Sequence, residues 1–153
     1  GKFHSILSYG IIFWASGAAL TTFRLQKRAV RIMFGLRRIT SCKPFFKTHK
    51  ILTLPSLLIY RTCLFVMQNR SKFTTNDEIH NYRTRQQNNL YIDSCNRSLF
   101  SNSVYATTIK IYNNLPVKIK TTTPMSKFKV ELRKYLLDKC FYSLSEYFTN
   151  GNL

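Results

Sequence analysis

The strongest constraint on the fold is the spacing of basic and apolar residues in the segment ALTTFRLQKRAVRIMFGL, residues 19–36. A helix turns by about 100° per residue, and this step gathers four basic side chains within an arc of roughly 100°. They are Arg24, Lys27, Arg28 and Arg31. The apolar side chains on the other side are Phe23, Leu25, Ala29, Val30, Ile32, Met33 and Phe34. The pattern predicts an amphipathic helix that ends near Gly35, a residue suited to a left-handed C-cap.

The segment before this helix, Phe3 to Trp14, is apolar nearly all round. It predicts a buried helix ended by Ser16 and Gly17, although its β-branched and aromatic content leaves a strand open. Residues 6–20 also mimic the apolar stretch of a signal peptide, but they carry Ser, Gly and Tyr and only one preceding lysine. The stretch is shorter than the roughly 20 residues that span a bilayer. We therefore expect an intracellular protein, in the nucleus or the cytoplasm, that is neither secreted nor embedded in a membrane.

Two further helices are expected after the amphipathic one. A short helix should run from Ser41 as its N-cap through Lys50, with Pro44 in its first turn. Its side chains divide into an inward pair, Phe45 and Phe46, and an outward pair, Lys43 and Lys47. The next segment, LPSLLIYRTCLFVMQNR at residues 54–70, is hydrophobic almost all round and is opened by Pro55. It predicts the central helix of the core.

The C-terminal third returns to helical patterns. Residues 104–115 predict a helix that Pro116 ends. Thr123 and Pro124 should open the last clear helix. Its apolar residues recur at helical spacing and are Phe128, Leu132, Tyr135 and Leu136. The tail FYSLSEYF should form a short helix or fray.

Between these halves lies a long polar segment, residues 69–103, rich in Asn, Ser, Thr, Arg and Gln. Its brief NLYI run, residues 89–92, could form a short strand, and the rest predicts a loop. The chain as a whole predicts a mostly α fold in a single helical domain over residues 1–153. Residues 1–68 form its basic and apolar helical part, residues 69–103 its loop, and residues 104–153 its C-terminal helices.

Basic residues far outnumber acidic ones: the chain has 24 Lys and Arg and only 6 Asp and Glu, which gives a formal net charge of +18 at pH 7. Such a surplus favours a polyanionic partner, RNA or DNA, bound mainly through phosphates. Nine basic residues and no acidic one lie between Arg24 and Lys50. The expected contacts there are Arg24, Lys27, Arg28, Arg31, Arg37, Arg38, Lys43 and Lys47. The competing interpretation is a helix face that is merely solvated, although such faces usually mix charges of both signs.

A second candidate contact is HNYRTR, residues 80–85. Tyr82 offers a ring for base stacking, and Arg83 and Arg85 would project to one side of an extended backbone. Single-stranded nucleic acid could be gripped in this way. A surface loop with no specific role remains equally open.

Nothing in the sequence indicates catalysis, a metal or a cofactor. The carboxylates are few, and the adjacent pair Asp77 and Glu78 should point in different directions in solvent. The four cysteines, Cys42, Cys63, Cys95 and Cys140, lack a zinc-binding spacing and predict reduced, mostly buried thiols. We therefore expect no catalytic residue, no metal ligand and no cofactor. A cationic helix lying on an anionic membrane surface is a further alternative.

Six strings occur together in one order over nearly the whole chain. They are HSILSYGIIFW, FRLQKRAVRIMFG, TSCKPFFKTHKILTLPSLLIY, IHNYRTR, IKIYNNLPVKIK and FKVELRKYLLDKCFYSL. In this order they resemble the C-terminal region of non-LTR retrotransposon reverse transcriptases, particularly the jockey-like arthropod elements. The family's catalytic palm carries a YxDD box, which lies upstream of the matched region and is not in this sequence.

The resemblance implies a thumb-like helical segment with a C-terminal tail, a fragment of a longer RNA-directed DNA polymerase. Its partners would be RNA or DNA and the palm domain of the parent polymerase. On its own the segment is expected to be no enzyme, because no catalytic residue of the family has a counterpart here. A decayed transposable-element fragment with only a structural or interaction role is the alternative. Phe13 and Trp14 are candidates for the surface that docks on the palm.

Overall fold

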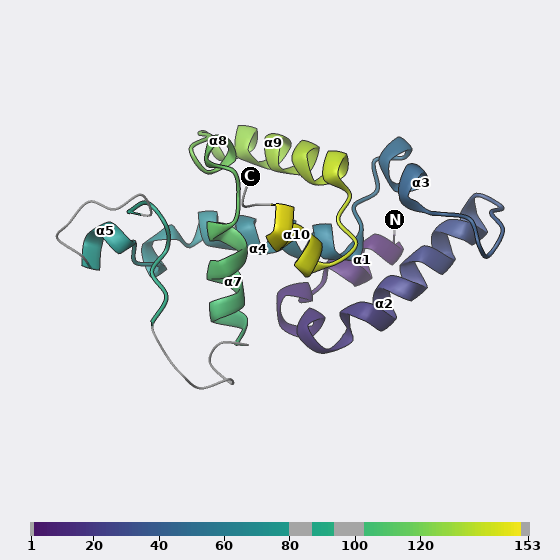
Figure 1. Cartoon of the computed structure of the whole chain (residues 1–153), viewed down its shortest axis with the longest axis horizontal. Coiled ribbons are helices and arrows are strands. Elements are labelled where there is room, and N and C mark those ends of the chain that lie inside the picture. The colour runs from purple at the N-terminus through teal and green to yellow at the C-terminus, as the bar shows by residue number, and fades with distance from the viewer. Residues whose placement is uncertain (1, 80–86, 94–102, 151–153) are drawn as a thin grey trace.

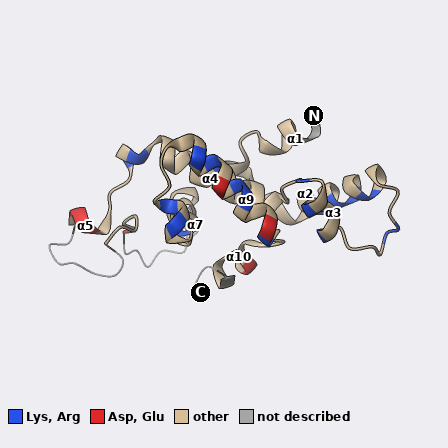
Figure 2. Cartoon of the chain, turned by 90° about the horizontal axis from the view of Figure 1, so that it is seen from above, with Lys and Arg blue, Asp and Glu red and all other residues tan. Residues whose placement is uncertain are grey.

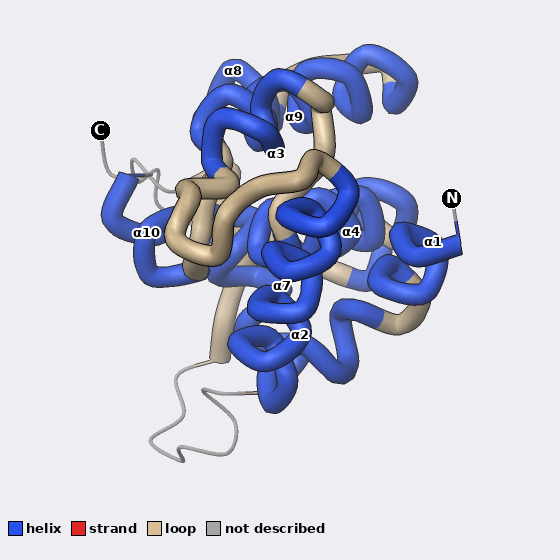
Figure 3. Tube along the Cα trace, turned by 90° about the vertical axis from the view of Figure 1, so that its right-hand side faces the viewer, coloured by secondary structure: helices blue, strands red, loops and turns tan. Residues whose placement is uncertain are grey.

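The computed structural model describes residues 2–79, 87–93 and 103–150. The chain is a single, mostly helical domain, and Figure 3 shows helices and loops but no strand in the described ranges. Its helices are α1 (Lys2–Ser8), α2 (Ile11–Met33), α3 (Lys43–Thr48), α4 (Leu54–Gln68), α5 (Asn76–Ile79), α7 (Val104–Asn113), α8 (Val117–Lys120), α9 (Met125–Lys139) and α10 (Leu144–Asn150). A short 3-10 turn, Arg70–Lys72, follows α4. The predicted fold class is confirmed.

Helix α4 is the centre of the domain, as its hydrophobic sequence predicts. Helices α1, α2, α7 and α9 all pack against it, and Figure 1 shows it running through the middle of the molecule. Thr53 begins the helix: its Oγ1 accepts a hydrogen bond from the Ser56 backbone N–H at 3.3 Å, and Pro55 occupies the first turn. Most of its side chains are buried, and Ile59 and Cys63 are fully inaccessible to solvent.

The C-terminal helices close the core as expected. In α9 the side chains of Phe128, Leu132 and Leu136 are fully buried along one stripe. The tail after α9 forms α10, whose Tyr147 ring packs edge-on against Phe141, with 5.2 Å between ring centroids. The Tyr147 hydroxyl donates a hydrogen bond to the carbonyl of Ile111 at 2.8 Å, so this buried polar group is satisfied. The short helix α8, which follows Pro116, is not predicted by the sequence pattern.

The expected boundary in the first apolar segment is wrong. The helical structure is interrupted at Tyr9 and Gly10, where Gly10 has a left-handed φ of 57°. Helix α2 then continues without interruption through Ser16 and Gly17. A glycine inside a helix costs only about 1 kcal/mol, which tertiary packing readily offsets. The segment is also less buried than expected, since Tyr9 is 85% exposed and Phe13 72% exposed.

The polar segment is more ordered in its first half than a plain loop. It contains the 3-10 turn and α5, and the expected NLYI strand is reduced to a single antiparallel bridge between Thr75 and Leu90. Leu90 is buried, and its backbone N–H and carbonyl both bond to the Asn113 side chain, at 2.8 and 2.9 Å. Two buried side chains, Phe73 and Leu90, therefore fasten this polar segment to the core.

Three of the cysteines are buried, reduced thiols, as expected: Cys42, Cys63 and Cys140. Burial raises the pKa of the Cys63 thiol, so this group stays neutral. Cys95 lies outside the described residues. Over the described ranges, no helix is both long and apolar enough to cross a bilayer.

Candidate nucleic-acid interface

The packing face of α2 differs from the one that its periodicity predicts. Over residues 19–33, the buried residues are Phe23, Gln26 and Val30. Leu25, Ile32 and Met33, expected on the apolar face, are 55%, 72% and 67% exposed. The reason lies in Gln26. Its Nε2 donates to the Leu52 carbonyl at 2.9 Å, and its Oε1 accepts from the Leu54 N–H at 2.8 Å. Because these bonds satisfy a buried amide, a polar residue occupies the middle of the packing face.

The end of α2 is fixed by the expected glycine cap. Gly35 has a φ of 60°, and the Leu36 N–H donates to the Arg31 carbonyl at 2.8 Å while the Gly35 N–H donates to Ile32 at 3.4 Å. These two bonds form a Schellman motif, which provides hydrogen-bond donors for carbonyls that have no partner within the helix. Because of this left-handed turn, the Arg38 side chain lies beside α2.

Arg31 holds this turn in place. Its Nε and Nη2 both donate to the Thr40 carbonyl, at 3.3 and 3.2 Å. Part of the donor capacity of the guanidinium is thus used inside the protein, and the side chain is half-buried. The sequence pattern does not reveal this contact, because Thr40 contributes only its backbone oxygen.

A second contact fixes the end of α2 from the other side. The Phe34 ring stacks on the His49 ring, with 4.1 Å between centroids and 19° between planes, and it lies 5.7 Å from the Phe45 ring. Helix α3 is therefore fastened to the last turn of α2 by aromatic packing. The His49 ring is thus part of this packing.

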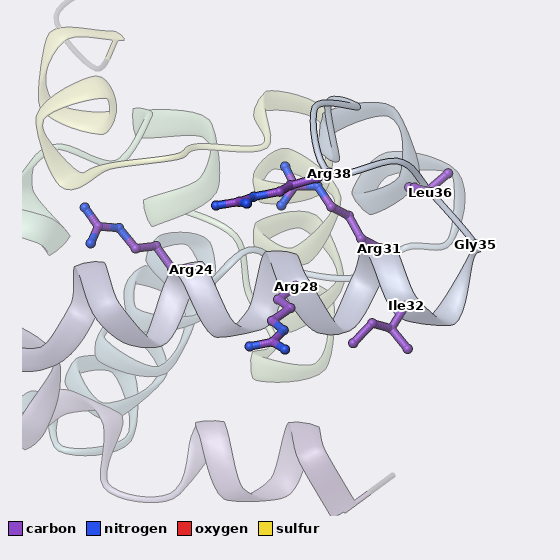
Figure 4. Close-up of a pocket in the computed structure, with 7 residues that line it drawn as sticks. All are labelled: Arg24, Arg28, Arg31, Ile32, Gly35, Leu36 and Arg38. Atoms are coloured by element: carbon purple, nitrogen blue, oxygen red, sulfur yellow. The ribbon is translucent and has the colours of Figure 1, made fainter.

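Four arginines border one open hollow of about 760 Å³ at this end of the molecule. Its lining residues are Arg24, Arg28, Arg31, Ile32, Gly35, Leu36 and Arg38. In Figure 4 the side chains of Arg24, Arg31 and Arg38 rise on one side of α2, and Arg28 and Ile32 extend on the other. The charged side chains that line the hollow therefore come from both sides of α2 and from the turn that follows it.

The cations of the hollow lack neutralising partners within the described part of the chain. The guanidiniums of Arg24, Arg28 and Arg38 are exposed and make no ion pair or hydrogen bond there. No acidic residue precedes Asp77 in the sequence. Figure 2 shows acidic positions on α5, α9 and α10 and none on α2. This end of the molecule is therefore a region of uncompensated positive charge.

Two of the predicted contacts are already engaged within the protein. Lys27 is half-buried, with its Nζ 4.8 Å from the Phe23 ring centroid and 5.7 Å from that of Tyr142, so it does not line the hollow. Lys43, expected to point outward, forms an ion pair with Glu146, Nζ to Oε1 at 3.3 Å. The partner is 103 residues away in sequence, so the local pattern cannot reveal it. Both lysines border the Tyr142 ring, and burial raises the pKa of Tyr142 to about 12.

The remaining predicted contacts fall into two groups. Arg37 and Lys47 are exposed and lie near the hollow in sequence without lining it. Tyr82, Arg83 and Arg85 lie outside the described residues. The structure thus brings together Arg24, Arg28, Arg31 and Arg38, and it adds the aliphatic residues Ile32 and Leu36, which charge alone does not indicate.

The adjacent acids Asp77 and Glu78 are exposed on α5, as predicted. Glu78 accepts a hydrogen bond from the Thr75 hydroxyl at 3.0 Å, which is a helix-start contact. Among residues 2–79, 87–93 and 103–150, no three His, Cys, Asp or Glu side chains gather in a way that could hold a metal ion. The hollow itself is lined by guanidinium groups, which bind anions such as phosphate. Comparisons with protein-family models, with characterised proteins and with solved structures find no match to this chain.

Proposed function

We propose that this chain is a nucleic-acid-binding segment, the C-terminal part of a non-LTR retrotransposon reverse transcriptase beyond its palm. The observation that supports binding most directly is the hollow lined by Arg24, Arg28, Arg31 and Arg38, with no carboxylate in its lining. The retrotransposon origin rests on the six ordered strings in the sequence.

Phosphates are the ligand that this arrangement favours. Arginine presents a planar set of donors that matches phosphate oxygens, and each phosphate contact releases counterions from the nucleic acid. Because such contacts carry no information about the bases, the binding should be independent of sequence. In the parent polymerase, this segment would hold the template or the nascent strand beside the palm.

The salt dependence of binding tests the proposal. With about four to six phosphate contacts, the logarithm of the affinity for duplex DNA should fall against the logarithm of salt with a slope of about −4 to −5. Fluorescence anisotropy with a labelled duplex measures this slope. The double variant Arg24→Ala/Arg28→Ala should make the slope shallower by about 2, because two contacts are lost.

The matched control is Lys127→Ala/Lys129→Ala, which removes the same charge from exposed positions on α9. This variant should leave the slope close to that of the unchanged protein. A flat slope for the unchanged protein, or equal losses in the two variants, would contradict a binding site at the hollow.

The segment alone should not polymerise. Primer extension on an RNA template with Mg²⁺ should give no product, because the palm aspartates are not in this sequence. Product that disappears when Asp77 or Asp93 is replaced by Asn would contradict this part of the proposal.

One observation favours a second candidate, an anionic membrane surface. Leu20, Leu25 and Ile32 are 74%, 55% and 72% exposed on the same helix that carries the arginines, as in helices that lie in a lipid interface. The hollow argues against this candidate, because a flat lipid surface cannot fill a recess between α2 and the turn that follows it.

A further inference from the structure

The hollow has an apolar part that phosphate binding does not use. Ile32 is 72% exposed and lines the hollow together with Leu36 and Gly35, whose position has no heavy atom within 4 Å of where a Cβ would lie. Arg28 precedes Ile32 by four residues, and the two side chains extend on the same side of α2 (Figure 4). An open aliphatic surface therefore adjoins the cations.

This combination distinguishes two forms of nucleic acid. A duplex presents its phosphates outward and keeps the flat faces of its bases stacked inside, so it would contact the arginines and leave Ile32 in water. A single strand exposes its base faces as well as its phosphates. A base can then cover an aliphatic side chain while the adjoining phosphates bind the guanidiniums.

The geometry points to single-stranded nucleic acid as the ligand of the hollow: phosphates on Arg24, Arg28 and Arg38, and an unstacked base against Ile32, which lies on the same side of α2 as Arg28 (Figure 4). This inference rests on the proposed function and deepens it. Arg31 is already held by the Thr40 carbonyl, so it fixes the turn and contributes its remaining donors. Gly35 adds no side chain to the lining of the hollow, and the space where its Cβ would lie is open.

The test compares two strands of equal charge. One is a labelled strand of about twelve deoxythymidines, within the usual site size, and the other is an abasic strand with the same number of phosphates. For the unchanged protein, anisotropy at fixed salt should give the base-bearing strand an affinity about fivefold to tenfold higher, because burial of the base against aliphatic surface adds to the phosphate contacts.

A pair of matched variants locates the effect. Ile32→Ser removes the aliphatic surface of the hollow, and Ile6→Ser makes the same change on α1 at an equal exposure of 72%. Ile32→Ser should abolish the preference for the base-bearing strand and leave duplex binding unchanged. Ile6→Ser should keep the preference. Circular dichroism of both variants should show the helical content of the unchanged protein, since both positions are on the surface.

The outcomes separate this inference from the function on which it rests. Equal, salt-dependent binding of the base-bearing and abasic strands would overturn the inference and leave nucleic-acid binding standing. Binding to neither strand nor to duplex would overturn both. Loss of the preference in both serine variants would place the base elsewhere. Vesicles of phosphatidylcholine and phosphatidylserine form the last arm: tighter binding to them than to the base-bearing strand, weakened by Ile32→Ser, would assign the surface to a membrane instead.

Discussion

At the scale of single residues, Gln26 decides how α2 packs. Its amide joins the middle of α2 to the backbone on both sides of Thr53, and it is only 3% exposed. A prediction from apolar spacing counts glutamine as a surface residue, so it does not place Gln26 on the buried face. It places Leu25 and Ile32 there instead, and both are exposed. In the structure the exposed Ile32 lines the hollow.

Replacing Gln26 by Leu should lower the free energy of unfolding by about 2–4 kcal/mol, because a buried backbone N–H and a buried carbonyl lose their partners. Urea denaturation measures the change. Gln68→Leu, at the exposed end of α4, is the matched control and should change stability by less than about 0.5 kcal/mol. Equal effects of the two substitutions would show that the Gln26 bonds contribute nothing.

Gly35 is the residue that fixes the turn beside the hollow. Gly35→Ala should cost about 1 kcal/mol of stability, since an L side chain is strained at a φ of 60° although space for it is open. Gly35→Asn should cost less, because asparagine tolerates the left-handed region. Thermal unfolding of both variants tests the order, and a larger loss for Asn than for Ala would contradict it.

At the scale of elements, the helices that follow strong local patterns are predictable from the sequence. The central helix and the helix of residues 104–113 have side-chain N-caps. These two helices and the last long helix also have prolines at or beside their ends and apolar spacing that agree with one another. The contacts that join these elements are not predictable, because the partners are far apart in sequence. The Lys43–Glu146 ion pair and the bond from Thr53 to Phe141, separated by 103 and 88 residues, are examples.

Thr53 illustrates how one residue joins two elements. Its Oγ1 accepts from the Ser56 N–H and lies 2.5 Å from the Phe141 carbonyl, to which the hydroxyl donates. Thr53→Val keeps the shape and removes these bonds, together with the one between the Thr53 and Ser56 hydroxyls at 2.9 Å. It should therefore cost about 2–3 kcal/mol in urea denaturation. Ser103→Ala removes only the local cap of α7, a bond to the Ala106 N–H at 3.1 Å, and should cost about 1 kcal/mol. A cost for Thr53→Val no greater than that for Ser103→Ala would contradict the link to Phe141.

At the scale of the whole molecule, the charge surplus that the sequence shows becomes a localised feature in the fold. The amino-terminal half contributes only cations, and α2 gathers part of them around the hollow while Lys27 and Lys43 are engaged elsewhere. The sequence indicates that the candidate site is positively charged and that it lies on the helix that becomes α2. It does not indicate which cations are left without partners, because this depends on where α10 places Glu146.

The stability of the whole molecule should depend on pH through His4. Partial burial, and then the positive charges of Arg61 and Arg133, lower the pKa of His4 below its usual 6.5. The unfolded chain therefore binds a proton at His4 more readily than the folded chain, and stability should fall as the pH drops through about 6.5 and below. Urea denaturation between pH 7.5 and 5 should show a smaller decline for His4→Gln than for the unchanged protein. An equal decline would exclude His4 as a contributor.

The central claim, that the arginines around the end of α2 form a nucleic-acid site, is tested most directly by mapping the bound surface. Titration of the ¹⁵N-labelled protein with a single strand of deoxythymidines should shift the amide resonances of residues 24–38 and the Nε resonances of Arg24, Arg28 and Arg38. The resonances of α9 should stay in place. Shifts spread evenly over the basic surface, or centred on α9, would contradict the claim.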